Sequence, residues 1–442
     1  MGDRTFRGGV HPEEMKELSC EKPLVSYAPK GDLVFLTSQH IGKPAAPVVK
    51  KGDQVLAGQL IAEASGFVSA NIVSSVSGTV KAVEMRPTAA GTMGQAIVIT
   101  SDGQNTLAEG VGVKTDYKTL SNQEILDKVK AAGIVGMGGA GFPTHVKLTV
   151  KEPEKINYII ANGAECEPYI TCDDQLMRSC AGEIVEGLEI ILRLFPKAVG
   201  VIAIEENKPQ AIAAMKAACA GHEKISVLPL MTKYPQGGER SLISVITGKH
   251  LKLGMLPADA GCVVDNVATI RAIYRAVCLN EPLMERTVTV SGDCTKDTGN
   301  FFVKVGTCAA ELVEAVGGWK EGVEPKKILF GGPMMGVALS SLEVPICKNN
   351  NAITALSYDT VEEETITACL RCGRCNRVCP LGLSPQLMQV AAMRKDYERY
   401  EKHLYGLECI ACGCCSYNCP AKRPLMQLFK QTKAEIMATK KR

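Results

Sequence analysis

The spacing of hydrophobic and polar positions in the middle of the chain changes between a helical and a strand period. The capping box at 121–124 opens an amphipathic pattern that predicts a helix ending at Gly133. Short apolar runs predict three strands further on, at 156–161, 199–204 and 225–230. Helical periodicity returns between them, for example near 209–220. This alternation predicts a parallel α/β sheet, in which ligands bind beyond the carboxyl ends of the strands.

The segment before this region has shorter apolar runs that are separated by regular turn signals. Residues 40–100 are predicted to form short strands, and 48–61 and 73–81 look like the two halves of a biotinyl/lipoyl-like barrel–sandwich. A carrier domain of that kind needs an acceptor lysine at its hairpin tip, which falls at about 66–71 and contains none. The pattern therefore favours a docking or covering domain over a swinging arm.

Three further segments lie on the C-terminal side of the α/β region. Residues 286–290 alternate between polar and apolar side chains and predict a strand, which is followed by the turn sequence Ser-Gly-Asp at 291–293. The glycine-rich stretch 331–336 is predicted to be a packed turn rather than a second phosphate-binding loop. Nearer the C-terminus, 384–405 has a helical pattern. This half of the chain is therefore expected to contain both β structure and helices.

Length and composition limit the class of protein. A chain of 442 residues is too long for one ordinary core and predicts two to four domains. Its 46% hydrophobic and 22% charged residues are typical of a soluble globular protein, and its net charge of +3 does not point to nucleic acid as a partner. No apolar window of about 20 residues is present, and the first residues contain no signal-peptide core. We therefore expect neither a membrane span nor export, and peripheral docking on a membrane complex remains open.

Cysteines supply the strongest chemical signal. Nine of the 19 cysteines lie between Cys369 and Cys419, in two runs of the form Cys-x-x-Cys-x-x-Cys-x-x-x-Cys-Pro. In bacterial two-cluster ferredoxins with this spacing, the first three cysteines of a run ligate one [4Fe–4S] cluster and the fourth ligates the other. The prediction is a first cluster on Cys369, Cys372, Cys375 and Cys419, and a second on Cys379, Cys409, Cys412 and Cys415. The chain is therefore expected to carry electrons in a reducing compartment.

Structural zinc is the alternative for these cysteines. Zinc sites use four ligands, usually in two separated pairs, and do not need a third cysteine two residues further on. Cys414 falls outside the spacing and is expected to be a spare thiol. The helical pattern between the runs favours an α-helical ferredoxin module over a small β-hairpin one.

A second candidate site lies directly after the predicted helix. Five glycines fall within the nine residues 133–141, and a further predicted helix that carries Lys147 follows. Bare backbone N–H groups at a helix N-terminus can cradle a phosphate, and a lysine adds positive charge. Such a loop is by itself also compatible with a flexible turn. The polar residues after the strand at 156–161 strengthen the binding interpretation, because they lie where a ligand of the sheet would bind.

Four segments of this region resemble, in the same order, the FMN- and NADH-binding segments of the flavoprotein subunit of respiratory complex I. They are 136–147, 162–168, 234–240 and 265–269. The resemblance implies an FMN site formed by Gly136, Gly138, Gly139, Gly141, Lys147, Asn162, Glu165, Tyr234, Gly237 and Asn266. It also implies that Phe142 stacks on the nicotinamide nucleotide, with Glu167 and Glu239 nearby.

Three residues depart from the complex I pattern in these segments. Met137 stands in place of an arginine, Ala164 in place of an aspartate and Gly238 in place of a glutamate. The fold is expected to tolerate these changes, whereas details of the flavin and nucleotide contacts depend on them. Hydride transfer itself needs no side-chain acid or base, so no catalytic residue is named.

The chain as a whole resembles the RnfC family of Rnf complex subunits. Residues 285–339 are similar to the soluble-ligand-binding β-grasp (SLBB) domain, and the start of the chain contains the sequence Phe-Arg-Gly-Gly-Val-His-Pro at 6–12. The implied fold is multidomain, α/β plus β: a barrel-sandwich hybrid, a Rossmann-like FMN/NADH domain, a β-grasp domain and an α-helical ferredoxin module. The expected boundaries are 1–112, 113–282, 283–345 and 358–442.

The resemblance also implies a function. It is that of a peripheral subunit on the cytoplasmic face of the cell membrane, in a membrane-bound ferredoxin:NAD+ oxidoreductase of the translocase class. Such a subunit exchanges hydride between NAD(H) and FMN and single electrons with two [4Fe–4S] clusters. Its implied partners are the other Rnf subunits, namely the membrane subunits and a ferredoxin-like subunit, through which it meets ferredoxin indirectly. These subunits couple electron transport to Na+ or H+ transport. A flavin suits this role, because it exchanges two electrons with nicotinamide and one with a cluster.

Two alternative functions remain open at this point. One is a soluble Rnf-like flavin and iron–sulfur reductase that serves another acceptor, such as a cobalamin. The other is a wiring subunit that keeps the flavin fold but has lost NAD(H) binding, which the departures at Met137, Ala164 and Gly238 suggest.

Overall fold

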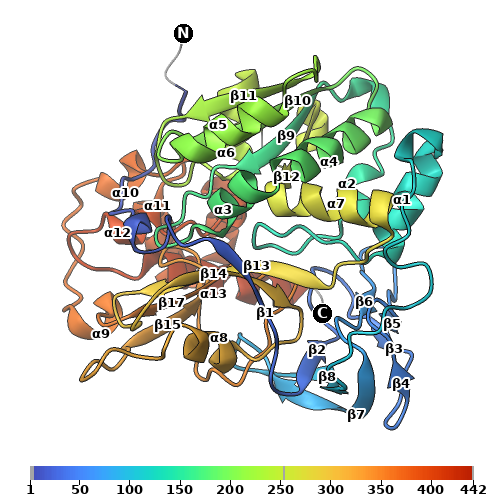
Figure 1. Cartoon of the computed structure of the whole chain (residues 1–442). Helices are drawn as coiled ribbons and strands as arrows, with labels where there is room; N and C mark the ends of the chain where they lie inside the picture. The colour runs from blue at the N-terminus through green and yellow to red at the C-terminus, as the bar shows by residue number, and fades with distance from the viewer. Residues whose placement is uncertain (1–3, 252–253, 441–442) are drawn as a thin grey trace.

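Four parts of the chain follow one another in sequence and pack together in the computed structural model, which describes residues 4–251 and 254–440 (Figure 1). Residues 1–3 and 441–442, at the outer limits of the first and last expected domains, and residues 252–253 lie outside the described residues. In Figure 1 the strands of residues 33–101 lie at the lower right, the α/β part at the top, and a mixed sheet below it. The C-terminal helices lie at the left and behind this sheet.

The α/β part is built on a four-stranded sheet of order β11-β10-β9-β12, in which all neighbours run parallel. Its strands are β9 (Tyr158–Gly163), β10 (Val199–Glu205), β11 (Ile225–Leu230) and β12 (Cys262–Asn266). The parallel sheet and the three strands predicted from apolar runs are confirmed. The strand β12 was not predicted, because its five residues carry an aspartate and an asparagine at the end.

Helices cover both faces of this sheet. They are α1 (Asn122–Ala131), α2 (Thr144–Leu148), α3 (Cys172–Ser179), α4 (Ala181–Leu194), α5 (Pro209–Ala218), α6 (Glu239–Thr247) and α7 (Val267–Leu279). Successive strand residues face opposite layers, so Ile159 packs in the core formed with α4 and α7, whereas Ile160 packs with α6. The predicted capping box of α1 is confirmed, because Ser121 and Glu124 each accept a hydrogen bond from the other's backbone N–H.

The N-terminal part is a barrel–sandwich of two small antiparallel sheets, as predicted. One contains β2 (Leu33–Leu36), β4 (Gln54–Val55), β7 (Gly78–Pro87) and β8 (Met93–Ser101), and the other β3 (Ala46–Pro47), β5 (Leu60–Glu63) and β6 (Ile72–Val73). The tip between β5 and β6 reaches the α/β part, where the Asn71 side chain donates to the carbonyl of Ala131. The backbone N–H of Ile41 donates to the carbonyl of Gly141 at 3.0 Å. The sandwich therefore covers one side of the glycine-rich loop.

The third part is a mixed sheet of order β1-β14-β13-β17-β15-β16. Its strands are β1 (Leu24–Tyr27), β13 (Glu285–Gly292), β14 (Gly299–Lys304), β15 (Lys327–Phe330), β16 (Val337–Ala338) and β17 (Ala352–Leu356), and α8 (Ala309–Ala315) packs on it. The sheet takes β1 from the start of the chain and β17 from beyond residue 345. The stretch 331–336 forms the predicted turn, between β15 and β16. The domain boundaries given above stay a prediction.

The C-terminal part is helical. They are α9 (Thr360–Glu363), α10 (Arg374–Arg377), α11 (Pro385–Met393), α12 (Cys414–Tyr417) and α13 (Leu425–Lys440). Met388 of α11 and Phe429 of α13 share one apolar core with Tyr400, which lies in a π-helical turn. The helical pattern predicted between the cysteine runs is confirmed in α11 and this turn.

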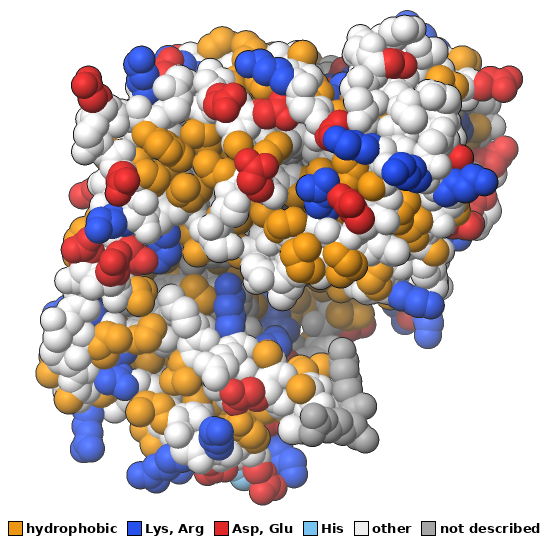
Figure 2. All heavy atoms as spheres, turned by 90° about the horizontal axis from the view of Figure 1, so that it is seen from below, with side chains coloured by type: hydrophobic (Ala, Val, Ile, Leu, Met, Phe, Trp, Pro, Cys, Tyr) orange, Lys and Arg blue, Asp and Glu red, His pale blue; other side chains and the backbone are white. Residues whose placement is uncertain are grey.

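The surface agrees with the balanced composition. Seen from below, acidic and basic side chains are interspersed with hydrophobic ones (Figure 2), as expected for a chain whose net charge is only +3. Among the described residues, no helix has both the length and the apolar character needed to cross a bilayer.

The contact between α4 and α7 generates a prediction about stability. A Cβ atom added at Gly187 would collide with the carbonyl oxygen of Ile270, whereas one added at Gly182 in the same helix would meet nothing within 4 Å. We expect Gly187→Ala to push α4 away from α7 and to destabilise the α/β part by about 1–3 kcal/mol. Gly182→Ala should be neutral or stabilising, by up to about 1 kcal/mol, because alanine favours helix. Thermal unfolding of the two variants measures the difference, and equal midpoints would contradict the packing described.

Candidate functional site

The eight predicted cluster cysteines line two separate cavities. One is lined by Cys369, Cys372, Cys375 and Cys419, and the other by Cys379, Cys409, Cys412 and Cys415. Each run thus contributes three cysteines to one cavity and its fourth cysteine to the other, which is the arrangement expected from the spacing. Gly373 and Gly413 adopt φ of +71° and +81° directly before α10 and α12, where the chain turns around each cavity. The donor set of each cavity fits one four-iron cluster.

Burial changes the acidity of two thiols that line the second cavity, Cys379 and Cys409. Desolvation raises the pKa of Cys409 to about 11 and also raises that of Cys379. A thiol in such surroundings loses its proton when a cation binds the sulfur, so metal loading releases protons here. Cys414, the predicted spare thiol, is fully buried beside the second cavity, and its sulfur faces the carbonyl of Tyr234.

The glycine-rich loop is held in shape by its own backbone and by α7. The N–H of Gly136 donates to the carbonyl of Phe142 at 2.8 Å, and the N–H of Met137 donates to the hydroxyl of Thr269 at 2.8 Å. Gly139 has φ +122° and faces open space, because a Cβ atom there would meet nothing within 4 Å. The face of the loop at Gly139 is therefore bare backbone. At the carboxyl edge of a parallel sheet, such a loop is a cradle that fits the phosphate of a bound nucleotide.

Lys147 supplies a cation beside this loop. It lies on α2, and its ammonium donates to the carbonyl of Val264 at 2.6 Å. The same ammonium lies 3.3 Å from the buried carboxylate of Asp265 and 3.7 Å from that of Glu239. Burial lowers the pKa of Lys147, but these two carboxylates outweigh it and leave the pKa above its ordinary value. Lys147 therefore stays protonated, and Glu239, a predicted NADH contact, is its ion-pair partner.

Asn162, Asn266 and Gly237 meet at the carboxyl ends of β9 and β12. Asn266 caps α7 through the N–H of Ala268, and its Cβ lies 3.4 Å from where a side chain on Gly138 would begin. The amide of Asn162 donates to the carbonyl of Gly237 at 2.9 Å. The structure thus brings the glycine loop, both asparagines and Gly237 to one edge of the sheet. Phe142, at the end of the loop, is half-buried.

Glu165, Glu167 and Tyr234 point to other partners. The carboxylate of Glu165 accepts the N–H groups of Asp173 and Asp174 at the start of α3. That of Glu167 accepts the N–H groups of Met334 and Met335, at 3.1 and 2.8 Å, in the turn between β15 and β16. The hydroxyl of Tyr234 donates to the carbonyl of Cys412 at 2.8 Å. Glu165 thus bonds within the α/β part, whereas Glu167 connects that part to the mixed sheet and Tyr234 connects it to the second cysteine cavity.

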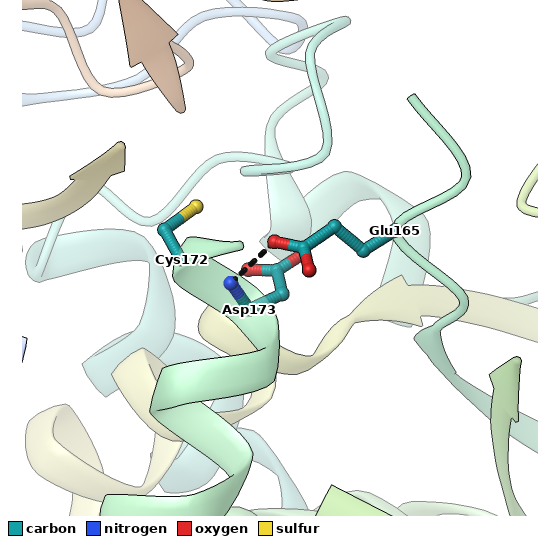
Figure 3. A group of neighbouring side chains, drawn as sticks. All are labelled: Glu165, Cys172 and Asp173. Carbon is teal, nitrogen blue, oxygen red and sulfur yellow. Dashed lines mark hydrogen bonds between the residues drawn. The ribbon is translucent and has the colours of Figure 1, made fainter. Parts of the chain in front are cut away.

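Glu165, Cys172 and Asp173 form a buried group whose ligand atoms lie within 4.8 Å of one another (Figure 3). Both oxygens of Glu165 already accept backbone N–H groups. The group is also surrounded by cations, because Lys16, Lys208 and Arg286 all act on the carboxyl pKa values there. Burial nevertheless raises the pKa of Glu165 to about 8. Lysine and arginine side chains therefore supply the positive charge around this group.

Sequence reasoning missed several buried cations that bind backbone carbonyls in and near this site. Arg286 of β13 donates to the carbonyl of Met137 at 2.7 Å, and Lys348 donates to that of Gly133 at 2.7 Å. Lys16 donates to the carbonyls of Glu165, Glu167 and Ile170. One signal was available for Arg286, because it shares the strand period of Val288 and Val290, whose side chains are fully buried. The sequence around Lys16 and Lys348 contains no comparable signal.

The departures from the complex I pattern have structural counterparts. Met137 is buried in the apolar core, so its side chain does not reach the open face of the loop. Ala164 is fully buried, and its Cβ atom lies 3.3 Å from where a Cβ atom on Gly237 would be. An aspartate at position 164 would therefore have little room. Gly238 is the residue before α6.

A parallel α/β domain with a glycine loop, joined through Tyr234 to a module with two four-cysteine cavities, defines an iron–sulfur flavoprotein of the electron-transfer class. The domain families agree with this class. Residues 4–104 match the RnfC barrel sandwich hybrid domain, 129–275 the Nuo51 FMN-binding domain, 287–338 the SLBB domain and 363–420 the 4Fe-4S dicluster domain. These matches confirm the predicted order of folds, and the dicluster match favours iron–sulfur clusters over zinc.

The chain belongs to the RnfC family, whose members are the C subunits of ion-translocating oxidoreductase complexes. It is 44% identical over 440 residues to the C subunit of the proton-translocating ferredoxin:NAD(+) oxidoreductase complex of Clostridium ljungdahlii, covering 99% of this chain and 95% of that protein. It is 40% identical to the counterpart in the Na(+)-translocating complex of Acetobacterium woodii, covering 99% and 98%. The C subunit of the ion-translocating oxidoreductase complex of Rhodobacter capsulatus is 43% identical, covering 86% and 73%.

The fold is shared with a solved structure of lower sequence identity. The crystal structure of an NAD+-reducing [NiFe]-hydrogenase in the air-oxidized state superimposes with a TM-score of 0.50 at 19% identity. The match covers 71% of this chain and 63% of that chain. At this identity the likeness concerns the fold alone.

The bond between Tyr234 and Cys412 generates a prediction about cluster stability. We expect Tyr234→Phe to cost about 1 kcal/mol, because it removes a buried hydrogen bond to the loop of the second cavity. About half of the total iron, that of the second cluster, should then be released to a chelator faster than in wild type. Tyr417→Phe is the matched control, because its side chain is 52% exposed and its hydroxyl makes no hydrogen bond within the described part of the chain. Equal release rates for both variants would contradict the role given to Tyr234.

Glu167 generates a prediction about pH. Burial raises its pKa from 4.5 to about 7, despite the two N–H groups that it accepts. The folded protein therefore holds a proton on Glu167 over a wider pH range than the unfolded chain does. The contribution of this group to the free energy of unfolding is complete below about pH 4.5 and is lost as pH rises through about 7. Glu167→Gln should flatten the pH dependence of unfolding between these values, by an amount of the order of 3 kcal/mol. Parallel pH profiles of wild type and variant would show that the carboxyl is not buried as described.

Proposed function

We propose that this chain is the NAD(H)-reactive, electron-converting subunit of a membrane-bound ferredoxin:NAD+ oxidoreductase. In this proposal it binds FMN in the α/β domain and two [4Fe–4S] clusters in the C-terminal module. It lies peripherally on the cytoplasmic face of the membrane and meets ferredoxin indirectly, through the other subunits of the complex. Those subunits couple electron flow to the transport of Na+ or H+. The names of the relatives support this function over a soluble reductase for another acceptor.

The arrangement of the two cysteine cavities is the observation that carries the proposal. The second cavity lies against the α/β domain, where Tyr234 bonds to Cys412 and Val10, Met334 and Cys414 share an apolar cluster with them. The first cavity lies farther along the module, and Cys369 and Cys372 are exposed there. A buried inner site and an exposed outer site form a path for single electrons from the flavin domain to the surface.

The residues of the chain bind and position the cofactor in this scheme. The loop 136–141 would hold the phosphate of FMN, with Lys147 beside it, and Asn162, Gly237 and Asn266 would line the flavin at the strand ends. FMN held in this way would supply the exchange between two-electron hydride chemistry and single-electron transfer. Phe142 would stack on the nicotinamide nucleotide, and Glu239 would lie near it. Glu165, Glu167 and Tyr234 would fix the segments that border this site, because their polar groups are engaged with α3, the β15–β16 turn and Cys412.

The proposed domain roles follow the same geometry. The N-terminal sandwich would cover the glycine loop, since Ile41 bonds to Gly141, and it has no acceptor lysine at its tip. The mixed sheet would hold the flavin domain and the cluster module together, because its β15–β16 turn contacts Glu167 on one side. On the other side, a Cβ atom on Gly413 would lie 2.8 Å from the carbonyl oxygen of Met334.

Titration of the anaerobically purified protein with NADH tests the proposal. We expect about eight irons and one FMN per chain, and NADH should bleach the visible absorption of the oxidised flavin. Phe142→Ala should raise the NADH concentration for half-reduction roughly three- to tenfold, through loss of ring stacking, and leave the iron content unchanged.

Phe142→Tyr is the control, because it keeps an aromatic face at the same position. A flavin that binds but is not bleached by NADH would favour the wiring subunit. Loss of iron in Phe142→Ala would contradict the separation of flavin and cluster domains.

A further inference from the structure

The two cysteine cavities differ in their charge. The outer cavity, on Cys369, Cys372, Cys375 and Cys419, is also lined by three arginines, Arg371, Arg374 and Arg423, and by no carboxylate among the described residues. The inner cavity, on Cys379, Cys409, Cys412 and Cys415, has no charged side chain among the residues that line it. A cluster with four thiolates is anionic and becomes more so on reduction. Guanidinium groups therefore favour an added electron at the outer site, and an apolar lining disfavours it at the inner site.

The basic character extends beyond the cavity. Between 365 and 395 the chain has five arginines and lysines and no aspartate or glutamate, although the net charge of the whole chain is only +3. Arg371, Arg374 and Arg377 are exposed and form no ion pair within the described part of the chain. Arginines elsewhere do pair, for example Arg240 with Glu408 and Arg271 with Glu183. The unpaired guanidinium groups around the outer site are thus free to attract an external anion.

Apolar side chains lie among these arginines. Leu370 is 65% exposed between two cysteines of the outer site, and Met393, 63% exposed, touches Arg423 through its sulfur. Arginine and methionine are enriched at protein interfaces, where apolar atoms give contact area and charges give orientation. We call the surface formed by Leu370, Arg371, Arg374, Arg377 and Met393 the arginine face.

We propose that the arginine face is the docking surface for an acidic protein that carries a one-electron redox centre, and that electrons cross there from the outer cluster. This inference rests on the proposed function, and it names the partner chemistry of its electron-exchange end. The transfer moves one electron: the outer cluster is oxidised by one equivalent, the partner's centre is reduced by one, and no proton or bond is involved. The reverse transfer uses the same contact. A lipid surface also attracts cations, but it offers no acceptor for the electron.

Charge complementarity sets the expected kinetics. Opposite charges steer association and can raise its rate by about 10- to 1000-fold at low ionic strength. Because the Debye length falls to roughly 3 Å at 1 M salt, the advantage should vanish there. The arginines also act on the cluster that they surround, so their removal should shift the reduction potential of one cluster and leave the other unchanged.

The test measures electron transfer from dithionite-reduced full-length protein to an acidic two-cluster ferredoxin by stopped-flow spectroscopy. The variant is Arg371→Gln, Arg374→Gln and Arg377→Gln combined. We expect its second-order rate constant to fall at least about tenfold at low salt, and to equal or exceed the wild-type value at high salt, where steering is screened and the lower cluster potential remains. The matched control combines Lys50→Gln, Lys51→Gln and Lys216→Gln, which changes the net charge equally at exposed lysines without ion pairs on other parts of the described chain. The control should keep the wild-type rate.

Three further measurements make the result decisive. With a basic cytochrome c as acceptor, the arginine variant should react as fast as wild type or faster. An anaerobic redox titration followed by electron paramagnetic resonance should show one cluster of the arginine variant at a lower potential. The third measurement is binding to anionic phosphatidylserine vesicles. The proposal would be overturned if the arginine variant lost vesicle binding but kept its rate with ferredoxin. It would also be overturned if the lysine control showed the same loss of rate. Since dithionite reduces the protein directly, these outcomes do not depend on whether NADH is its donor.

Discussion

Buried cations that donate hydrogen bonds to backbone carbonyls hold the parts of this chain together. Lys16 binds the N-terminal segment to the loop 165–170, Arg286 binds the mixed sheet to Met137, and Lys348 binds the segment before β17 to Gly133. A buried cation is costly unless its donors find acceptors, because water no longer solvates it. Rotation of any part would strand such a charge in the interior. The glycine loop and the segment after β9 are therefore fixed from three directions, which keeps the cofactor sites at constant separation.

The junction between the flavin domain and the cluster module depends on a narrow ribbon at the start of the chain. Val10 pairs with Tyr234, and the N–H of Gly9 donates to the carbonyl of Val378. Gly8 has φ +81°, and a side chain there would begin 2.7 Å from the carbonyl oxygen of Cys379. Only glycine allows this approach. The ribbon thus packs against the run that supplies Cys379 to the inner site, whereas Cys369 and Cys372 of the outer site are exposed.

The features that the sequence predicted correctly depend on short-range spacing. The cysteine runs, the capping box at Ser121 and the strands of the parallel sheet are all encoded within about ten residues, where periodicity and turn geometry are decisive. The directions of Glu165, Glu167 and Tyr234 depend on residues far away in sequence, such as Met334 and Cys412. The same holds for β1, whose partner strand is β14. Local pattern could identify these residues as polar groups near a site, but not which side of the site each would face. The FMN and NADH assignments therefore stay predictions.

The pairing of β1 with β14 has a consequence for biosynthesis. Leu24 lies opposite Asn300, so the edge strand of the mixed sheet leaves the ribosome 276 residues before its partner. At about 5–20 residues per second this interval lasts roughly 15–55 s. The barrel–sandwich, whose strands all lie between residues 33 and 101, can fold during that time. The segment ahead of it must wait unpaired. Strand β1 can therefore complete the edge of the mixed sheet only after β14 has been synthesised. Both cysteine cavities form later still, because each is lined by cysteines from both runs.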